Sequence, residues 1–360
     1  MAYLTLEDGT IFKGETFGAS RDIMGEVVFN TGMTGYQEAL TDPSYHGQIV
    51  TMTYPIIGNY GMNDEVAESA GPQVKAFVVR EVCEDPSNWK SQGKLADYLE
   101  ENDIVGLSGI DTRELTRKIR EKGTMHGIIT KTPPSAAQIE EMKAFEMPQP
   151  VERVTTREVY EFGEGEYTRR IAVLDFGLKR NILRSLAKRG CRLTVFPALT
   201  DPQEILDGKF DGLMLTNGPG NPRDNMEIVE NLKQLVGELP IFGICLGHQL
   251  LALAMGADTE KLKYGHRGSN HPVKDMQKNR VYITSQNHGY TIKNRSLPDC
   301  AVVSHKSWND RTIEGVRYVG YPMFTVQFHP EAAPGPEDTA YLFDEFMELI
   351  DSYNAEKGAV

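Results

Sequence analysis

The sequence predicts an α/β protein in which an N-terminal mixed α/β domain precedes a C-terminal domain with an open, mostly parallel sheet, flanking helices and a β-rich insertion. Three observations predict this organisation. The chain has 360 residues, a length for which two domains are the usual expectation. Between about residues 131 and 170 the composition shifts to prolines and then to glycines and glutamates, as in an inter-domain segment. Beyond it, strand-like runs alternate with helix-like runs, the order of a parallel sheet covered on both faces.

Residues 1–150 are expected to form the first domain. They are rich in glycine and threonine, and short β-like runs occur at 26–30, 48–53 and 73–80. One helix is well signalled at 112–121, because Asp111 can cap its N-terminus and Gly123 can end it. Residues 151–170 are expected to be a linker.

Residues 171–360 are expected to form the second domain. Strands are predicted at 171–176, 192–196, 212–216 and 241–245. Helices are predicted at 179–188, 202–207 and 225–236, and another directly after Cys245. The stretch 263–327 is β-like with many turns, and 336–353 has the apolar spacing of a closing amphipathic helix. A shorter helix is expected near 136–145, before the linker.

The bulk composition excludes several classes of function. The chain carries 38 basic and 51 acidic residues, a net charge of −13, which disfavours nucleic acid and anionic membranes as partners. Its four cysteines form no CxxC pair, so neither a disulfide framework nor a zinc knuckle is predicted. The first residues lack the apolar core of a signal peptide, and no apolar run approaches membrane-spanning length. A reduced, cytoplasmic setting is expected.

The most informative motif surrounds Cys245. A strand-like run ends there, a helix-like run follows, and Gly243 and Gly247 lie two residues to either side. This is the pattern of a nucleophile elbow with cysteine in place of serine, where bulky neighbours would clash and the helix N-terminus favours a thiolate. Most cysteines are simply small buried hydrophobic residues, and that interpretation is kept for Cys83, Cys191 and Cys300.

A cysteine nucleophile needs a base and a group that orients the base. His329 is the best candidate base, because a β-like run delivers it and Glu331, two residues on, lies on the same side of an extended chain. His266 and His271 match no compact metal-ligand set and are interpreted as part of a loop rich in Gly, Asn and Pro. His248, in the first turn after the elbow, is expected to be structural.

The oxyanion of an acyl-transfer reaction also needs hydrogen-bond donors. The elbow places the backbone N–H of Leu246, and the loop containing Gly218 and Gly220 is expected at a neighbouring strand end, where glycine permits close approach. The chain contains neither a G-x-x-x-x-G-K-[ST] loop nor a G-x-G-x-x-G fingerprint, so no nucleotide site is expected in this chain.

These motifs together resemble a known family. The run Gly243-Ile-Cys-Leu-Gly-His-Gln249 with His329-Pro-Glu331 is similar to class I glutamine amidotransferases. More narrowly, the chain resembles the small, glutaminase subunit of carbamoyl-phosphate synthetase. That resemblance rests on Asn217–Gly220, Gly265–Pro272, Ser285–Gly289 and His329–Pro336, and in the N-terminal half on Phe29–Glu38, Thr41–Ser44 and Gly109–Arg113.

The resemblance implies a class I glutamine amidotransferase domain and a set of residue roles. Cys245 is the nucleophile, His329 moves the proton and Glu331 orients His329. The implied L-glutamine-binding residues are Ser44, Gly218, Gly220, Leu246, Gln249, Asn287, Gly289 and Tyr290. Two positions depart from the family pattern, since Tyr290 stands where many members have Phe and Arg267 lies in a loop that often carries His.

The resemblance also implies a partner. Ammonia from glutamine would pass to a large subunit, which makes carbamoyl phosphate from bicarbonate and two ATP. ATP and a divalent metal ion are then expected on that partner, with no cofactor or metal in this chain. Other interpretations remain: an amidotransferase that serves another acceptor, a cysteine hydrolase built on the same elbow, or a non-catalytic assembly subunit. The sequence does not distinguish arginine from pyrimidine biosynthesis.

Overall fold

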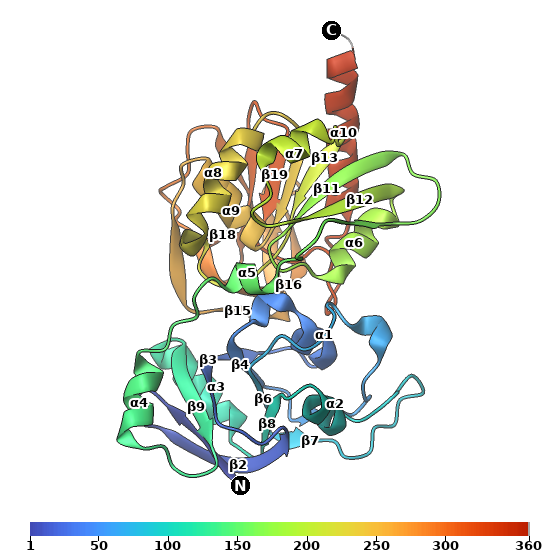
Figure 1. Cartoon of the computed structure of the whole chain (residues 1–360). Helices are drawn as coiled ribbons and strands as arrows, with labels where there is room; N and C mark the ends of the chain where they lie inside the picture. The colour runs from blue at the N-terminus through green and yellow to red at the C-terminus, as the bar shows by residue number, and fades with distance from the viewer. Residues whose placement is uncertain (359–360) are drawn as a thin grey trace. The chain divides into compact units, whose positions relative to one another are not determined.

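The computed structural model describes residues 1–358 and divides into two compact units, Met1–Pro148 and Gln149 onward (Figure 1). The boundary predicted from the sequence lies two residues later, at residue 150. The segment 151–170, expected to be a linker, is ordered within the second unit. It contains most of α5 (Pro150–Val154), the strand β10 (Tyr160–Phe162) and the beginning of β11 (Arg169–Asp175). Because β10 pairs with β12 (Cys191–Pro197), this segment is an edge of the second unit's sheet.

The first unit is built on a closed barrel with the strand order β1-β2-β8-β6-β4-β3-β9. Its strands are β1 (Ala2–Leu6), β2 (Ile11–Gly18), β3 (Ile23–Asn30), β4 (Gln48–Met52), β6 (Ala76–Val78), β8 (Val105–Ser108) and β9 (Met125–Thr130), with a separate pair β5 (Ile56–Ile57) and β7 (Glu81–Val82). Its helices are α1 (Tyr36–Thr41), α2 (Leu95–Glu101), α3 (Thr112–Lys122) and α4 (Ala136–Lys143), with 3₁₀ turns η1 (Pro43–Tyr45) and η2 (Asp64–Val66). The short β-like runs thus form a barrel, which the sequence did not predict.

Helix α3 confirms its predicted caps. The Asp111 side chain accepts a hydrogen bond from the Glu114 N–H at 2.8 Å, which satisfies one of the donors that a helix N-terminus leaves unpaired. At the other end, Gly123 has φ 106°, a conformation that glycine adopts easily.

The second unit contains a ten-stranded sheet in the order β10-β12-β11-β13-β14-β19-β18-β17-β15-β16. Strands β12, β11, β13 (Gly212–Leu215), β14 (Ile241–Ile244) and β19 (Met323–Val326) run parallel. Besides the edge strand β10, the remaining strands are β15 (Thr259–Asp275), β16 (Arg280–Ile292), β17 (Ala301–Ser307) and β18 (Ile313–Tyr318). These four pair antiparallel and form the predicted β-rich insertion. The prediction of an open, mostly parallel sheet with such an insertion is confirmed.

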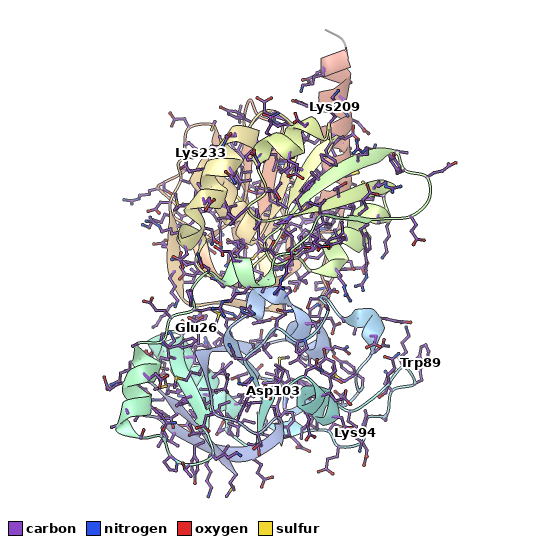
Figure 2. The ribbon with its side chains drawn as sticks, viewed as in Figure 1. Glu26, Trp89, Lys94, Asp103, Lys209 and Lys233 are labelled. Carbon is purple, nitrogen blue, oxygen red and sulfur yellow. The ribbon has the colours of Figure 1, made fainter. Side chains whose placement is uncertain are left out.

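Helices cover both faces of the parallel strands (Figure 1). One face packs against α7 (Pro202–Asp207), α8 (Met226–Leu235) and α9 (Leu246–Ala254), and the other against α6 (Arg180–Ala187) and α10 (Tyr341–Gly358). Successive residues of a strand point to opposite faces, so Leu213 and Leu215 belong to the first core and Met214 to the second. Exposed side chains such as Lys209 and Lys233, and Trp89 and Lys94 in the first unit, project outward (Figure 2).

Two expectations for this unit are corrected. The stretch 264–272, expected to be a loop, belongs to β15, because β16 supplies hydrogen-bond partners along it and two register shifts absorb its irregular residues. Gly265 and Gly268, with φ 71° and 143°, allow these bends. The closing helix begins at Tyr341 rather than at 336, because residues 338–340 form a turn, in which the Ala340 N–H bonds to the carbonyl oxygen of Glu337 three residues back.

Among the described residues, no helix combines the length and apolar character needed to cross a membrane.

Candidate active site

Cys245 lies on the sharp turn between β14 and α9, as the elbow motif predicts. Its backbone has φ 53° and ψ −102°, a conformation that costs a non-glycine residue about 1–3 kcal/mol. A Cβ at Gly247 would lie 2.5 Å from the Leu215 carbonyl oxygen, and one at Gly243 would lie 2.9 Å from Thr325 Cγ2. Both glycines are therefore required for the turn to fit between the neighbouring strands.

Replacing Gly247 with alanine should damage the elbow. The added methyl group would meet backbone of β13, which cannot move aside as a flexible side chain can. The free energy of unfolding should fall by about 1–3 kcal/mol, the usual cost of overpacking, together with catalytic activity. Thermal unfolding measures the first effect. Gly93→Ala is the matched control, because nothing lies within 4 Å of a Cβ there; equal losses in both variants would contradict the argument.

The predicted base and its orienting carboxylate are buried in the same unit as the elbow. Nδ1 of His329 lies 2.7 Å from Oε1 of Glu331, and the two residues are 1% and 3% exposed. The Cys245 thiol interacts with the same imidazole. Nε2 of His329 makes no well-formed hydrogen bond within residues 1–358, so it is the nitrogen available for proton exchange with the thiol. Cysteine, histidine and glutamate thus have the arrangement of a catalytic triad.

The electrostatics of the pair favour an ion pair. Burial alone would lower the pKa of His329, but the Glu331 carboxylate outweighs it and raises that pKa to about 10. Burial would likewise raise the pKa of Glu331, but Lys179 and His329 lower it to about 2. At neutral pH the imidazole is therefore cationic beside the thiol, which is the arrangement that activates a cysteine nucleophile.

Lys179 is a member of this site that sequence reasoning missed. It is 2% exposed, and its Nζ lies 2.9 Å from Oε1 of Glu331 and 2.6 Å from the carbonyl oxygen of Ala332. The neighbouring Asn181 donates a hydrogen bond to the Glu331 carbonyl oxygen. Lys179 is the N-cap residue of α6, 152 residues before its partner, and only its position at a strand's carboxyl end could have suggested a role.

The predicted oxyanion donors lie next to each other. Leu246 is the first residue of α9, so its N–H has no acceptor within the helix. A Cβ at Gly218 would lie 2.2 Å from the Phe176 carbonyl oxygen and 2.8 Å from Leu246 Cδ2. Only glycine lets this loop approach the elbow so closely, as expected from the sequence.

Several of the implied glutamine-binding residues surround Cys245. The carbonyl oxygen of Asn287 lies 3.7 Å from its Sγ. Gln249, on the first turns of α9, donates to the carbonyl oxygen of Tyr290 at 2.8 Å and to Gln327 at 2.9 Å. The Tyr290 carbonyl oxygen thus joins β16 to α9, and a change of the Tyr290 side chain leaves this backbone contact intact.

The other implied residues have less direct placements. A Cβ at Gly289 would lie 3.3 Å from the guanidinium of Arg267, which donates to the carbonyl oxygen of Tyr264. Gly220, φ 90°, packs near Pro150.

Ser44 belongs to the other unit, where it lies in η1 and donates its N–H to Asp42.

His248 has the structural role expected for it. It is fully buried, and its Nδ1 lies 2.7 Å from the Thr325 hydroxyl, which ties α9 to β19. Burial lowers the pKa of His248 to about 3, so the ring is neutral and carries no charge into the site.

Comparisons with known proteins agree with this geometry. Residues 4–129 match the family described as "Carbamoyl-phosphate synthase small chain, CPSase domain", and residues 172–349 match "Glutamine amidotransferase class-I". The carbamoyl phosphate synthase small chain of Clostridium perfringens is 53% identical over 96% of this chain and 99% of its own length, and that of Bacillus caldolyticus 54% identical over 99% and 98%. The pyrimidine-specific small chain of Halalkalibacterium halodurans is 52% identical over 97% of both.

Among solved structures, a putative GMP synthase component from Thermoplasma acidophilum aligns with a TM-score of 0.48 and 24% identity, over 54% of this chain and 100% of that one. The sequence relatives cover nearly the whole chain and nearly the whole of themselves. The resemblance inferred from the motifs is confirmed: the chain belongs to the carbamoyl phosphate synthase small chain family and carries a class I glutamine amidotransferase domain.

Proposed function

We propose that this chain is the glutaminase subunit of a glutamine-hydrolysing carbamoyl phosphate synthase. It converts L-glutamine and water to L-glutamate and ammonia. The observation that carries this proposal is the buried Cys245, His329 and Glu331 constellation on a strained elbow, in a chain of this family.

In this mechanism the Cys245 thiolate attacks the side-chain amide carbon of glutamine. The oxyanion that forms accepts hydrogen bonds from the backbone N–H groups of Leu246 and Gly218. The His329 imidazolium gives its proton to the leaving nitrogen, and ammonia departs as the thioester forms. His329 then takes a proton from water, which attacks the thioester, and glutamate leaves.

The binding of glutamine is assigned in the same proposal. The residues proposed to bind it are Ser44, Gly218, Gly220, Leu246, Gln249, Asn287, Gly289 and Tyr290. Two observations support the proposal: Gly218, Leu246 and Asn287 lie beside the elbow, and Gln249 of α9 donates a hydrogen bond to the carbonyl oxygen of Tyr290 in β16.

The ammonia passes to a large subunit, where bicarbonate and two ATP are used. ATP and its divalent metal ion belong to that partner, since this chain has no phosphate-binding loop. An enclosed route keeps ammonia from water and protons, so the two chains form a tight heterodimer. The complex is cytoplasmic and supplies carbamoyl phosphate to arginine biosynthesis, pyrimidine biosynthesis or both.

The test is co-expression of this chain with the large subunit encoded by the same organism. We expect the two to co-purify, and the complex to make carbamoyl phosphate from either glutamine or ammonium, whereas the isolated large subunit uses only ammonium. The same preparation should hydrolyse glutamine but not a peptide substrate. A complex that uses only ammonium although Cys245 is intact would contradict the proposal, and a chain that is fully active as a glutaminase without any partner would contradict the heterodimer.

A further inference from the structure

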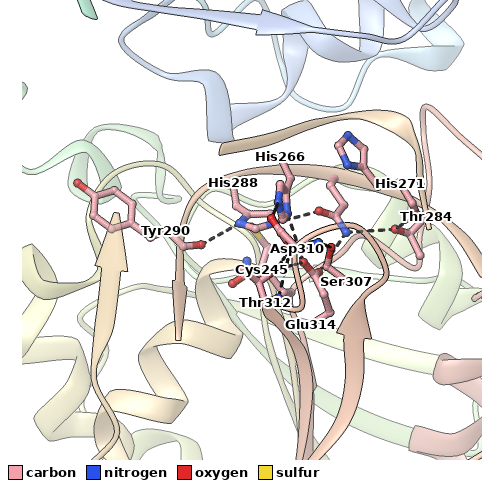
Figure 3. A network of polar contacts seen from close by, with 12 residues as sticks. Cys245, His266, His271, Thr284, His288, Tyr290, Ser307, Asp310, Thr312 and Glu314 are labelled. Carbon is pink, nitrogen blue, oxygen red and sulfur yellow. Dashed lines mark hydrogen bonds and ion pairs between the residues drawn. The ribbon is translucent and has the colours of Figure 1, made fainter. Parts of the chain in front are cut away.

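A second buried polar cluster lies on the antiparallel part of the sheet, one residue from the wall of the Cys245 site (Figure 3). His266 of β15 and His288 of β16 occupy directly opposed positions of the hairpin, with ring centroids 4.9 Å apart. Glu314 of β18 joins them, and the three residues are 8%, 5% and 0% exposed. His288 follows Asn287, whose carbonyl oxygen contacts the Cys245 thiol. The catalytic mechanism uses none of the three.

Three atoms of this cluster converge on one point. Nδ1 of His266 lies 3.3 Å, and Nε2 of His288 lies 3.9 Å, from Oε1 of Glu314, and all three atoms lie within 4.8 Å of one another. Ligand atoms about 2.0–2.2 Å from a tetrahedral zinc ion are roughly 3.3 Å apart. The separation of His266 Nδ1 and Glu314 Oε1 already matches that value, and His288 Nε2 would move closer to both atoms when an ion binds.

The outer nitrogens of both imidazoles are held by acceptors. Nε2 of His266 lies 2.7 Å from Oδ2 of Asp310, and Nδ1 of His288 lies 2.8 Å from the carbonyl oxygen of Tyr290. Each outer nitrogen must carry a proton, so in a neutral ring the inner nitrogen presents its lone pair to the cluster. A carboxylate on one ring and a backbone carbonyl on the other are the partners that fix the tautomer of metal-binding histidines.

In the protein alone, two hydrogen-bond acceptors face each other: the unprotonated Nε2 of His288 and the side-chain oxygen of Gln286. Oε1 of Gln286 lies 3.1 Å from Nε2 of His288, while the amide nitrogen of Gln286 donates to Glu314 at 3.1 Å. Turning the amide over would relieve His288 but set the amide oxygen against the Glu314 carboxylate. A cation at the centre satisfies every one of these acceptors.

We propose that His266 Nδ1, His288 Nε2 and Glu314 Oε1 bind one divalent transition-metal ion of the zinc type. Two histidines and one glutamate are a known zinc donor set, and Gln286 Oε1 or water completes a tetrahedron. The charges of Glu314 and Asp310 balance the ion once both rings are neutral.

The site would be structural for the neighbouring wall of the Cys245 pocket. It would join β15, β16 and β18 beside Asn287, Gly289 and Tyr290 without entering the reaction. The sequence did not indicate it, because Glu314 lies 48 residues beyond His266 and only the hairpin and β18 bring the ligands together. The expectation of no metal site at these histidines was based only on the spacing of His266 and His271 along the chain.

The test uses the full chain carrying Cys245→Ser, which removes the thiolate that could itself bind zinc beside His329. After treatment with a chelator and dialysis, Zn²⁺ binding is measured by competition with a chromogenic chelator. We expect one equivalent to bind and to raise the melting temperature. Glu314→Gln and His266→Asn should each weaken binding by more than 100-fold. Asp310→Asn, which keeps all three ligands, should weaken it by about 10–100-fold.

His305→Asn is the matched control, because His305 is a buried imidazole of the same sheet, paired with Asp275 and outside the cluster. It should bind Zn²⁺ as the parent does. Absence of stoichiometric binding in the parent would overturn the proposal, as would binding that Glu314→Gln and His266→Asn leave unchanged. Should either ligand variant fail to fold, Asp310→Asn and the thermal shift of the parent decide the question.

Discussion

Replacing Cys245 with serine is expected to lower glutamine hydrolysis by a factor of at least about 10⁴. The reaction needs a strong nucleophile, which the sulfur of Cys245 supplies beside the cationic His329. A serine hydroxyl ionises far less readily, so it would occupy the elbow without attacking the amide. The fold should persist, since the two side chains have nearly the same shape. Release of glutamate from glutamine, followed with time, measures the loss.

Two comparisons make that result specific to the nucleophile. Cys300→Ser, at a half-buried cysteine that the structure places outside the triad, should keep its glutaminase activity. In the proposed complex, Cys245→Ser should stop glutamine-dependent carbamoyl phosphate synthesis and leave ammonium-dependent synthesis largely unchanged. If Cys245→Ser retained substantial glutaminase activity, another residue would have to be the nucleophile.

Those parts of the site whose residues lie close together in the chain were identified from the sequence. The elbow needs a cysteine and two glycines within five positions, and its turn follows from the steric contacts of Gly243 and Gly247 with the neighbouring strands. His329 and Glu331 were expected to share a side of an extended segment. The structure forms a turn there instead, closed by the hydrogen bond from the Ala332 N–H to the His329 carbonyl oxygen, and the turn still brings the two side chains within 2.7 Å. Such local patterns specify geometry before the remainder of the chain is considered.

The parts that could not be predicted depend on strand pairing. Short β-like runs do not reveal whether they close, so the barrel of the first unit was not foreseen. Glycine, asparagine and proline predicted a loop at 264–272, but the pairing of β15 with β16 outweighs these local preferences. The same pairing sets His266 opposite His288, which no spacing along the chain indicates. Ion pairs between distant segments, such as Lys179 with Glu331, belong to this class.

Replacing Lys179 with methionine should destabilise the protein and slow catalysis together. The variant removes the ammonium that lies 2.9 Å from the fully buried Glu331 side chain. Losing one partner of a buried ion pair costs about 3–5 kcal/mol, and we expect a value near the lower end because His329 still faces the carboxylate. A misplaced Glu331 no longer orients His329, so kcat should fall by about 10²-fold. Denaturant unfolding and steady-state kinetics measure the two effects.

The pH dependence separates this ion pair from a general packing defect. The pKa of Glu331 is about 2 in the folded protein and 4.5 ordinarily, so the pair contributes its full stability above pH 4.5 and loses it as the pH falls toward 2. The stability difference between the wild type and Lys179→Met should therefore be largest near neutral pH and shrink below pH 4.5. Lys188→Met, at the exposed end of the same helix, should change neither stability nor kcat appreciably. A difference for Lys179→Met that stays constant with pH would show that lost packing, rather than the charge of Lys179, supports the triad.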